Sequence, residues 1–156
     1  MKYLFHFLIL IVLVSISSCK SENRTLKDEE REIRDYIASH PEYSFVRKES
    51  GLYFADIVVG DGVTPDSNDR VYVRYIGTFV DGTEFDSNMD SAKDFRFYVD
   101  KYEVIEGFNE SVKYMKEGGT AIIIVPSALG YGNINSHFDP YTPLVFTISI
   151  KSVVVI

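Results

Sequence analysis

The chain of 156 residues contains no tryptophan, one cysteine and only three histidines. A lone cysteine cannot build an internal disulfide framework. His6 lies in an apolar N-terminal segment, and His40 and His137 are far apart, with no cysteine or other histidine nearby at the spacing of zinc ligands. The sequence therefore predicts neither a disulfide-stabilised fold nor a metal site.

Basic residues are also scarce, with 16 lysines and arginines against 23 aspartates and glutamates. Affinity for nucleic acid comes largely from neutralising phosphates, so this acidic chain is not expected to bind nucleic acid. The sequence has no glycine-rich phosphate loop, no G-x-S-x-G elbow and no other nucleophile motif. We therefore expect neither a cofactor nor covalent catalysis.

The remaining composition is typical of a globular domain, with 46% hydrophobic, 25% charged and 14% aromatic residues. Without the first 18 residues, 156 − 18 = 138 residues remain. A chain of that length buries roughly two thirds of its unfolded surface without disulfides or metals. One compact core is the expectation.

The N-terminus has the three parts of an export signal. Met1 and Lys2 precede an apolar run over residues 3–16, which is shorter than the roughly 20 residues of a membrane-spanning helix. Ser17-Ser18-Cys19 then resembles the lipobox of bacterial lipoproteins. Residues 1–18 are thus expected to be a lipoprotein signal peptide, with Cys19 acylated and inserted in a lipid bilayer of the cell envelope. That bilayer is expected to be the outer membrane, with the domain on its periplasmic or surface face. A plain signal peptide that leaves Cys19 as a free thiol, or an uncleaved anchor, remains open.

Residues 19–50 are expected to form a lipid-anchored tether and a short helix. The first of them, KSENR after the cysteine, are polar, as in a flexible linker. Thr25 and Asp28 have the spacing of a capping box, which opens helices. Apolar side chains then share one helical face as far as Pro41, namely Leu26, Ile33, Tyr36 and Ile37. Two interpretations remain open for this helix. It packs through this face on the domain or on a partner, or it is a solvated spacer.

From Gly51 onward the apolar residues recur with the period of strands. Asp81-Gly82 predicts a hairpin with a type I′ turn, in which both central residues have positive φ. Residues 104–115 carry apolar side chains at helical spacing. Runs of strands with one internal helix predict an α+β domain, with an antiparallel sheet wrapped on that helix.

Three motifs follow one another in this region: Y-x-G-x-x-x-D-G-x-x-F-D from Tyr75, V-I-x-G-F from Val104 and L-x-Y-G from Leu129. Together with FRFYV, EGFNESVKYMKEGG and PLVFTISI, they resemble the FKBP-type peptidyl-prolyl cis-trans isomerases over residues 51–153. The resemblance implies an isomerase domain over residues 51–156, folded as an antiparallel half-barrel sheet around one short helix. It also implies catalysis of X-Pro isomerisation without a cofactor, and binding of macrolide inhibitors. Combined with the export signal, it predicts that the substrates are proline-containing exported polypeptides.

The resemblance also implies a pocket made of aromatic and aliphatic side chains. Asp86 would form hydrogen bonds at its rim, while the Ile105 backbone N–H and the Tyr131 hydroxyl would bind ligand carbonyls. The residues expected to be catalytic are Tyr75, Phe85, Asp86, Phe108, Tyr131 and Phe146. Those expected to bind substrate are Phe95, Val104, Ile105 and Phe138.

The chain departs from the family pattern at several places, among them Arg74 and Ile76 on either side of Tyr75. Phe108 replaces the usual tryptophan of the pocket floor, and Ser111 replaces a glycine. Phe138-Asp139-Pro140 replaces the family's I-P-P before the last strand, in a shortened loop. This loop motivates a second interpretation, a peptide-binding chaperone or interaction module with little isomerase activity. A structural envelope lipoprotein without a ligand is a third.

Overall fold

The computed structural model describes residues 24–133 and 138–156. The expected signal peptide, residues 1–18, and the lipidation site Cys19 lie outside the described residues. Among those that are described, no helix has the length and apolar character needed to cross a membrane.

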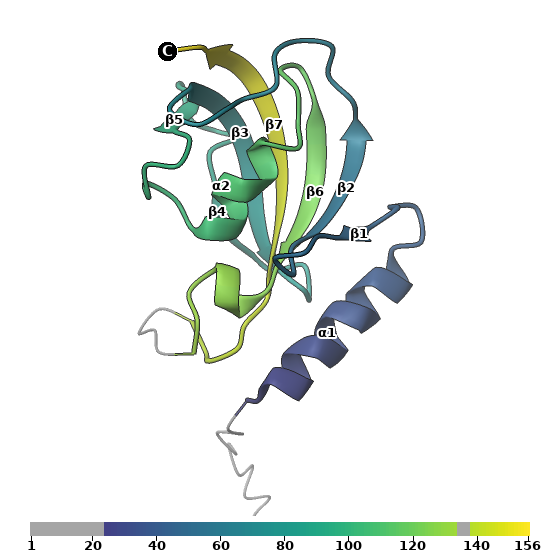
Figure 1. The fold of residues 1–156 in the computed structure, drawn as a ribbon. Coiled ribbons are helices and arrows are strands. Elements are labelled where there is room, and N and C mark those ends of the chain that lie inside the picture. The colour runs from purple at the N-terminus through teal and green to yellow at the C-terminus, as the bar shows by residue number, and fades with distance from the viewer. Residues whose placement is uncertain (1–23, 134–137) are drawn as a thin grey trace, which may run out of the picture.

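The described chain forms one curved antiparallel sheet (Figure 1). The strands run in the order β1-β2-β6-β7-β3-β4, and β5 pairs with β3 beyond the end of β4. The expected α+β class is confirmed. The strands are β1 (Val46–Arg47), β2 (Tyr53–Val58), β3 (Arg70–Phe79), β4 (Glu84–Ser87), β5 (Phe95–Tyr98), β6 (Thr120–Val125) and β7 (Leu144–Val154).

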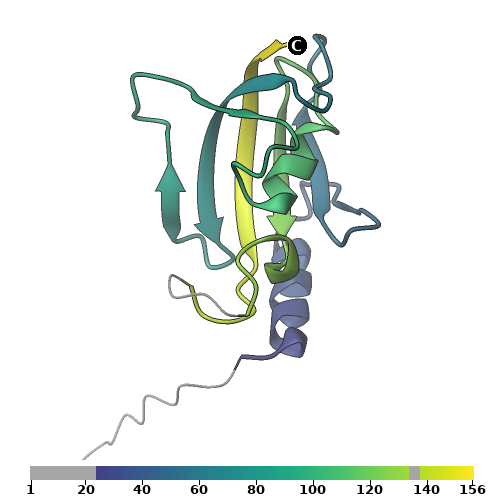
Figure 2. The ribbon, with the colours of Figure 1, turned by 60° about the vertical axis from the view of Figure 1, so that its left-hand side comes forward.

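The short helix α2 (Glu106–Val112) lies in the concave face of the sheet, as Figure 2 shows. Phe108 and Val112 are buried there among the inward-facing side chains of β3, β6 and β7. The helix is shorter than residues 104–115 because Ile105, its N-cap, is extended, with ψ of 151°. Close packing also requires Gly107, since a Cβ there would lie 2.6 Å from Cγ1 of Val125 in β6.

A second helix, α1 (Leu26–Ser39), begins with the expected capping box, in which Asp28 N–H donates to Thr25 Oγ1 and Thr25 N–H to Asp28 Oδ2. Its apolar face packs on the outer face of the sheet, where Ile33 is 3% exposed. The helix is therefore not a solvated spacer. The sheet residues beneath it are Ala55, Ile122, Ile124 and Val145. Leu26, at the first turn, lies outside this contact and is 57% exposed.

The turn between β3 and β4 differs from the expected type I′. Gly82 has a φ of +86°, whereas Asp81 does not have positive φ. Gly82 N–H donates to Phe79 O, and Phe79 N–H donates to Thr83 O, so the loop is one residue longer than a two-residue hairpin. Asp81 Oδ1 accepts a hydrogen bond from Thr83 N–H at 2.8 Å. That side-chain bond favours a three-residue loop with glycine at its left-handed position.

Candidate active site

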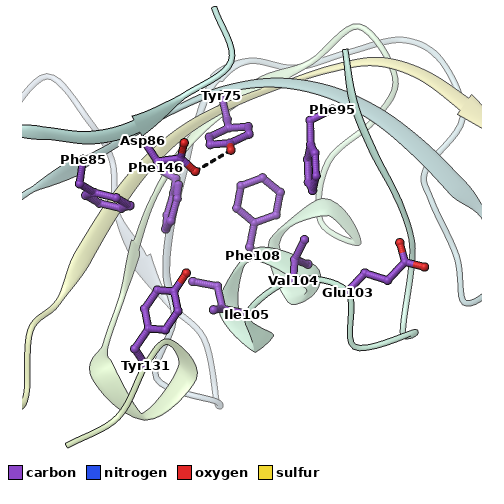
Figure 3. A pocket seen from close by; sticks show the side chains of 10 residues that line it. All are labelled: Tyr75, Phe85, Asp86, Phe95, Glu103, Val104, Ile105, Phe108, Tyr131 and Phe146. Atoms are coloured by element: carbon purple, nitrogen blue, oxygen red, sulfur yellow. Dashed lines mark hydrogen bonds between the residues drawn. The ribbon is translucent and has the colours of Figure 1, made fainter. Parts of the chain in front are cut away.

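A cavity of about 270 Å³ opens between α2 and the strands that curve around it (Figure 3). It combines residues from β3, β4, β5 and β7 with the segments around α2 and the loop after β6. The lining residues are Tyr75, Phe85, Asp86, Phe95, Glu103, Val104, Ile105, Phe108, Tyr131 and Phe146. All of them except Glu103 are among the site residues that the sequence predicts, whereas the predicted Phe138 is not part of this lining.

Phe108, from α2, forms the centre of the floor and is 4% exposed. Its ring lies edge to face against Tyr75 and Phe146, with centroid distances of 5.6 and 5.3 Å. Phe95 contacts the Tyr75 ring in the same way at 5.7 Å. Such pairs contribute about 0.5–1.5 kcal/mol each beyond the burial of their area, so the floor is rigid as well as apolar.

The wall formed by Phe85 and Phe146 depends on a glycine in β3. A Cβ at Gly77 would lie 2.8 Å from Cζ of Phe85 and 2.9 Å from Cε1 of Phe146. Both rings therefore lie directly on the backbone of β3, and they meet edge to face at 5.6 Å. Because no side chain projects from β3 at Gly77, there is room for two aromatic rings at one side of the cavity.

One hydrogen bond between side chains crosses the rim. The Tyr75 hydroxyl donates to Asp86 Oδ2 at 2.7 Å, as the dashed line in Figure 3 shows. Burial of the phenol, and then the hydrogen bond to the carboxylate, raise the pKa of Tyr75 well above its usual value. Tyr75 is therefore a neutral hydrogen-bond donor, and its acceptor is Asp86.

Two residues of the lining, Tyr131 and Ile105, carry a hydrogen-bond donor. The Tyr131 hydroxyl points into the cavity, and the side chain is 42% exposed (Figure 3). Ile105 is the N-cap of α2, and its N–H finds no backbone acceptor among the described residues. Both groups can donate a hydrogen bond to a carbonyl that enters the cavity, which is the role that the family resemblance implies for them.

Phe138 lies beside the cavity. Its ring packs against Phe79, Phe85 and Tyr131, with centroid distances of 5.6, 5.3 and 4.9 Å. It lines a neighbouring groove, together with Asp139 and others. Its contact with substrate stays a prediction, but its ring packs against two rings of the lining, those of Phe85 and Tyr131.

Three residues that shape the site are missed by sequence reasoning. Glu103 lines the cavity and accepts a hydrogen bond from Tyr98 N–H, in a loop that carries no periodic pattern. Asn88 accepts a 2.7 Å hydrogen bond from the backbone N–H of Tyr75. Arg74 donates to Asp94 and to two carbonyls of the loop after β4. For Asn88 the sequence offers one signal, the string FDSN, in which Asn88 follows two residues of the kinds that form turns. It offers none for the other two residues.

Comparison with known proteins agrees with this geometry. The sequence model of the family described as "FKBP-type peptidyl-prolyl cis-trans isomerase" matches residues 62–151. The chain belongs to this family. The matched FKBP segment contains every residue of the cavity lining.

Individual FKBP relatives cover different shares of the chain. It is 36% identical over 114 residues to FK506-binding protein 4 of Dictyostelium discoideum, which covers 72% of this chain and 31% of that protein. It is 38% identical over 106 residues to the outer membrane protein MIP of Legionella longbeachae, covering 67% of this chain and 45% of MIP. The chain thus spans less than half the length of these two relatives.

The same fold has been solved for related FKBP proteins. The peptidyl-prolyl cis-trans isomerase of Pseudomonas syringae pv. tomato superposes with a TM-score of 0.69 and 29% identity, over 85% of this chain and 98% of that one. This similarity supports the arrangement of sheet and helices, including the presence of an N-terminal helix.

Proposed function

We propose that this FKBP protein accelerates the cis-trans isomerisation of X-Pro bonds in exported polypeptides. The observation that carries the proposal is the small aromatic cavity with Phe108 as its floor. Family membership places the chain among isomerases and supports the same reaction class.

The chemistry of the cavity suits this reaction. Amide resonance gives the X-Pro bond a rotation barrier of about 18–20 kcal/mol. In the twisted transition state the prolyl nitrogen loses conjugation and the amide becomes less dipolar, so an apolar, water-poor pocket favours it over the planar ground state. A barrier lowered by about 5.5 kcal/mol would give roughly ten-thousandfold acceleration. No covalent bond to the protein forms in this mechanism.

Two donors would hold the substrate while the bond rotates. The Ile105 N–H and the Tyr131 hydroxyl would each bind a carbonyl of the peptide, and the rings around Phe108 would enclose the proline. Asp86 would act through Tyr75, since its carboxylate accepts a hydrogen bond from the Tyr75 hydroxyl and fixes that ring. The pyrrolidine ring and its neighbouring carbonyls are thus the features recognised.

The location that we propose is the cell envelope. One relative is named an outer membrane protein, and the N-terminal sequence resembles a lipoprotein signal. Acylated Cys19 would anchor the chain in the bilayer, with residues 51–156 as the isomerase domain. Macrolide binding is proposed because another relative is named an FK506-binding protein.

A peptide-binding module with weak isomerase activity is the second candidate. The observation that favours it is the position of Phe138 and Asp139 beside the cavity, where the sequence departs from the family. Such a module would bind chains at the same aromatic surface but would not lower the barrier.

The experiment is the exchange rate of Phe-Pro and Leu-Pro peptides, measured by NMR with the full-length chain in mild detergent. Wild type is compared with Tyr131→Ala and with Tyr102→Asn as a control. Tyr102 is fully exposed and has a φ of 57°, which asparagine tolerates. Exchange accelerated by wild type and by the control, but weakened by Tyr131→Ala, supports the isomerase. The binding module would be favoured if this protein is folded and suppresses the aggregation of an unfolded test protein, yet leaves the X-Pro peptides exchanging at the uncatalysed rate.

A further inference from the structure

Helix α1 contacts the β6–β7 connection, which contributes Tyr131 and Phe138 to the site region. The described parts of this connection are residues 126–133 and 138–143. The first part contains the short 3-10 helix η1 (Ser127–Leu129), which lies close to α1 in both views (Figures 1 and 2). Glu29 of the helix holds the first part, and Arg24, which precedes the helix, holds the second.

The first contact is a buried carboxylate. Glu29 of α1 is 3% exposed and accepts hydrogen bonds from the backbone N–H of Ser127 and, at 2.9 Å, from its hydroxyl. Ser127 is itself 3% exposed. A buried carboxylate is costly unless it is hydrogen bonded, so these two bonds fix Ser127 relative to α1. The contact joins residues 98 positions apart in the chain.

Ser127 is connected in turn to the residues that flank Tyr131. Its carbonyl accepts hydrogen bonds from Gly130 N–H at 3.0 Å and from Gly132 N–H at 2.7 Å. The residues on both sides of Tyr131 are thus bonded to Ser127, and Ser127 is bonded to Glu29. This chain of hydrogen bonds leads from the outer helix to the Tyr131 side chain in the cavity.

The second contact holds the far part of the connection. Arg24, which precedes the N-cap Thr25 of α1, donates from Nε to Pro140 O at 3.1 Å and from Nη2 to Tyr141 O at 3.2 Å. Glu32 orients the guanidinium through an ion pair of 2.6 Å. Phe138, whose ring supports Tyr131 at 4.9 Å, precedes these two carbonyls.

We propose that Glu29 is a positioning residue for the isomerase site. Through Ser127 it sets the orientation of Tyr131, and Arg24 braces the other end of the same connection. The inference rests on the proposed function in one respect, since Tyr131 is taken as a ligand of the substrate carbonyl. It assigns a role in the reaction to a helix outside the matched family segment.

The test compares Glu29→Ala, Glu29→Gln and the control Glu30→Ala in the full-length chain. Glu30 is an exposed carboxylate on the same helix. We expect Glu29→Ala to raise KM for a Leu-Pro peptide about fivefold, the effect of one lost hydrogen bond, with kcat changed less. Glu29→Gln retains an acceptor for the Ser127 N–H and should restore a KM near wild type. Glu30→Ala should leave both constants unchanged.

Backbone hydrogen exchange supplies a readout that does not need enzyme activity. In Glu29→Ala, the amides of Gly130 and Gly132 should exchange about fivefold faster, while those of β6 and β7 keep their wild-type rates. Equal loss of protection throughout the sheet, or unchanged rates and KM, would overturn the inference. If wild type does not accelerate X-Pro isomerisation, the proposed function fails. The amide hydrogen-exchange rates still show whether Glu29 fixes the residues on either side of Tyr131.

A milder variant covers the case in which Glu29→Ala does not fold. Ser127→Ala removes the 2.9 Å bond to Glu29 and keeps the backbone contact. We expect a smaller change of the same kind, about twofold in KM and in the exchange of Gly130 and Gly132. Wild-type values for both in this variant, together with a misfolded Glu29→Ala, would assign Glu29 to stability alone and overturn the inference.

Discussion

Tyr75 in β3 and Asp86 in β4 are joined across the rim of the cavity by a 2.7 Å hydrogen bond from the hydroxyl to the carboxylate. The same Tyr75 ring contacts Phe95 and Phe108 edge to face. One bond therefore connects the polar rim to the apolar floor. It orients the aromatic ring relative to the Asp86 carboxylate.

Substitution of Asp86 tests this relationship. Asp86→Asn keeps an oxygen that can accept a hydrogen bond from the Tyr75 hydroxyl. In Asp86→Ala the hydroxyl can donate only to water. We expect Asp86→Ala to lower the free energy of unfolding by about 1 kcal/mol and kcat/KM by a few fold, with Asp86→Asn between it and wild type. Denaturant titration and peptide exchange rates measure the two effects. Equal losses in both variants would show that charge, rather than the hydrogen bond, matters.

The raised pKa of Tyr75 predicts that the protein loses stability at alkaline pH. Burial is the larger cause and Asp86 the next. Because the folded pKa exceeds the unfolded value of about 10, the contribution to stability is complete below pH 10 and is lost as pH rises through the folded pKa. NMR of the tyrosine Cζ carbons should show Tyr75 still neutral at pH 10. In Asp86→Ala its pKa should fall toward the usual value; an unchanged titration would remove Asp86 as a cause.

Gly77 is predicted to be essential for the shape of the cavity wall. In Gly77→Ala the new methyl group would lie under 3 Å from the rings of Phe85 and Phe146, so both must move. Overpacking of this kind costs about 1–3 kcal/mol of stability. We expect kcat/KM per folded molecule to fall as well, because the displaced rings enter the cavity.

The matched control for Gly77 is Gly82→Ala. Gly82 has a φ of +86°, and a Cβ added there would have no atom within 4 Å, so alanine strains the backbone without touching the cavity. It should lower stability by about 1 kcal/mol and leave the activity of the folded fraction unchanged. If both variants lose activity in proportion to stability, the close approach at Gly77 has no specific role in the site.

The lipid anchor is predicted from the N-terminal sequence alone. Mass spectrometry of membrane-extracted protein should find Cys19 at the N-terminus with the added mass of acyl chains. Cys19→Ser should abolish the modification and release the domain, because one hydroxyl cannot take the place of the thioether. A soluble wild-type product cleaved elsewhere would contradict the prediction and favour the plain signal peptide.

Much of the cavity could be predicted from the sequence because its side chains stand in a motif of fixed spacing. Tyr75, Phe85 and Asp86 lie on two strands joined by one hairpin, so their proximity follows from local pairing. The sheet and α2 follow from hydrophobic periodicity in the same way.

The unpredicted features depend on contacts between distant segments. Glu29 occupies a helix position that is indistinguishable, in sequence, from its exposed neighbours, and its burial depends on Ser127, 98 residues away. The turn at Asp81 differs from expectation because a side chain competes with the backbone for Thr83 N–H. Neither effect leaves a periodic signal.

The role of Phe108 as a platform for proline can be separated from its role in the core. Phe97 is a buried neighbour, 1% exposed, whose ring lies 5.8 Å from that of Phe108 but does not line the cavity. Phe108→Leu and Phe97→Leu should each cost less stability than the about 3–5 kcal/mol of a Phe→Ala change, and by similar amounts.

Only the Phe108 variant should lose catalysis by the folded protein. Removal of an aromatic contact worth about 0.5–1.5 kcal/mol to the substrate predicts a fall of up to about tenfold in kcat/KM for Phe108→Leu. Phe97→Leu should retain wild-type kcat/KM well below its melting temperature. Equal losses in the two variants would mean that the floor acts through general rigidity, because Phe97 contacts the lining rings of Phe95 and Phe108 but does not line the cavity itself.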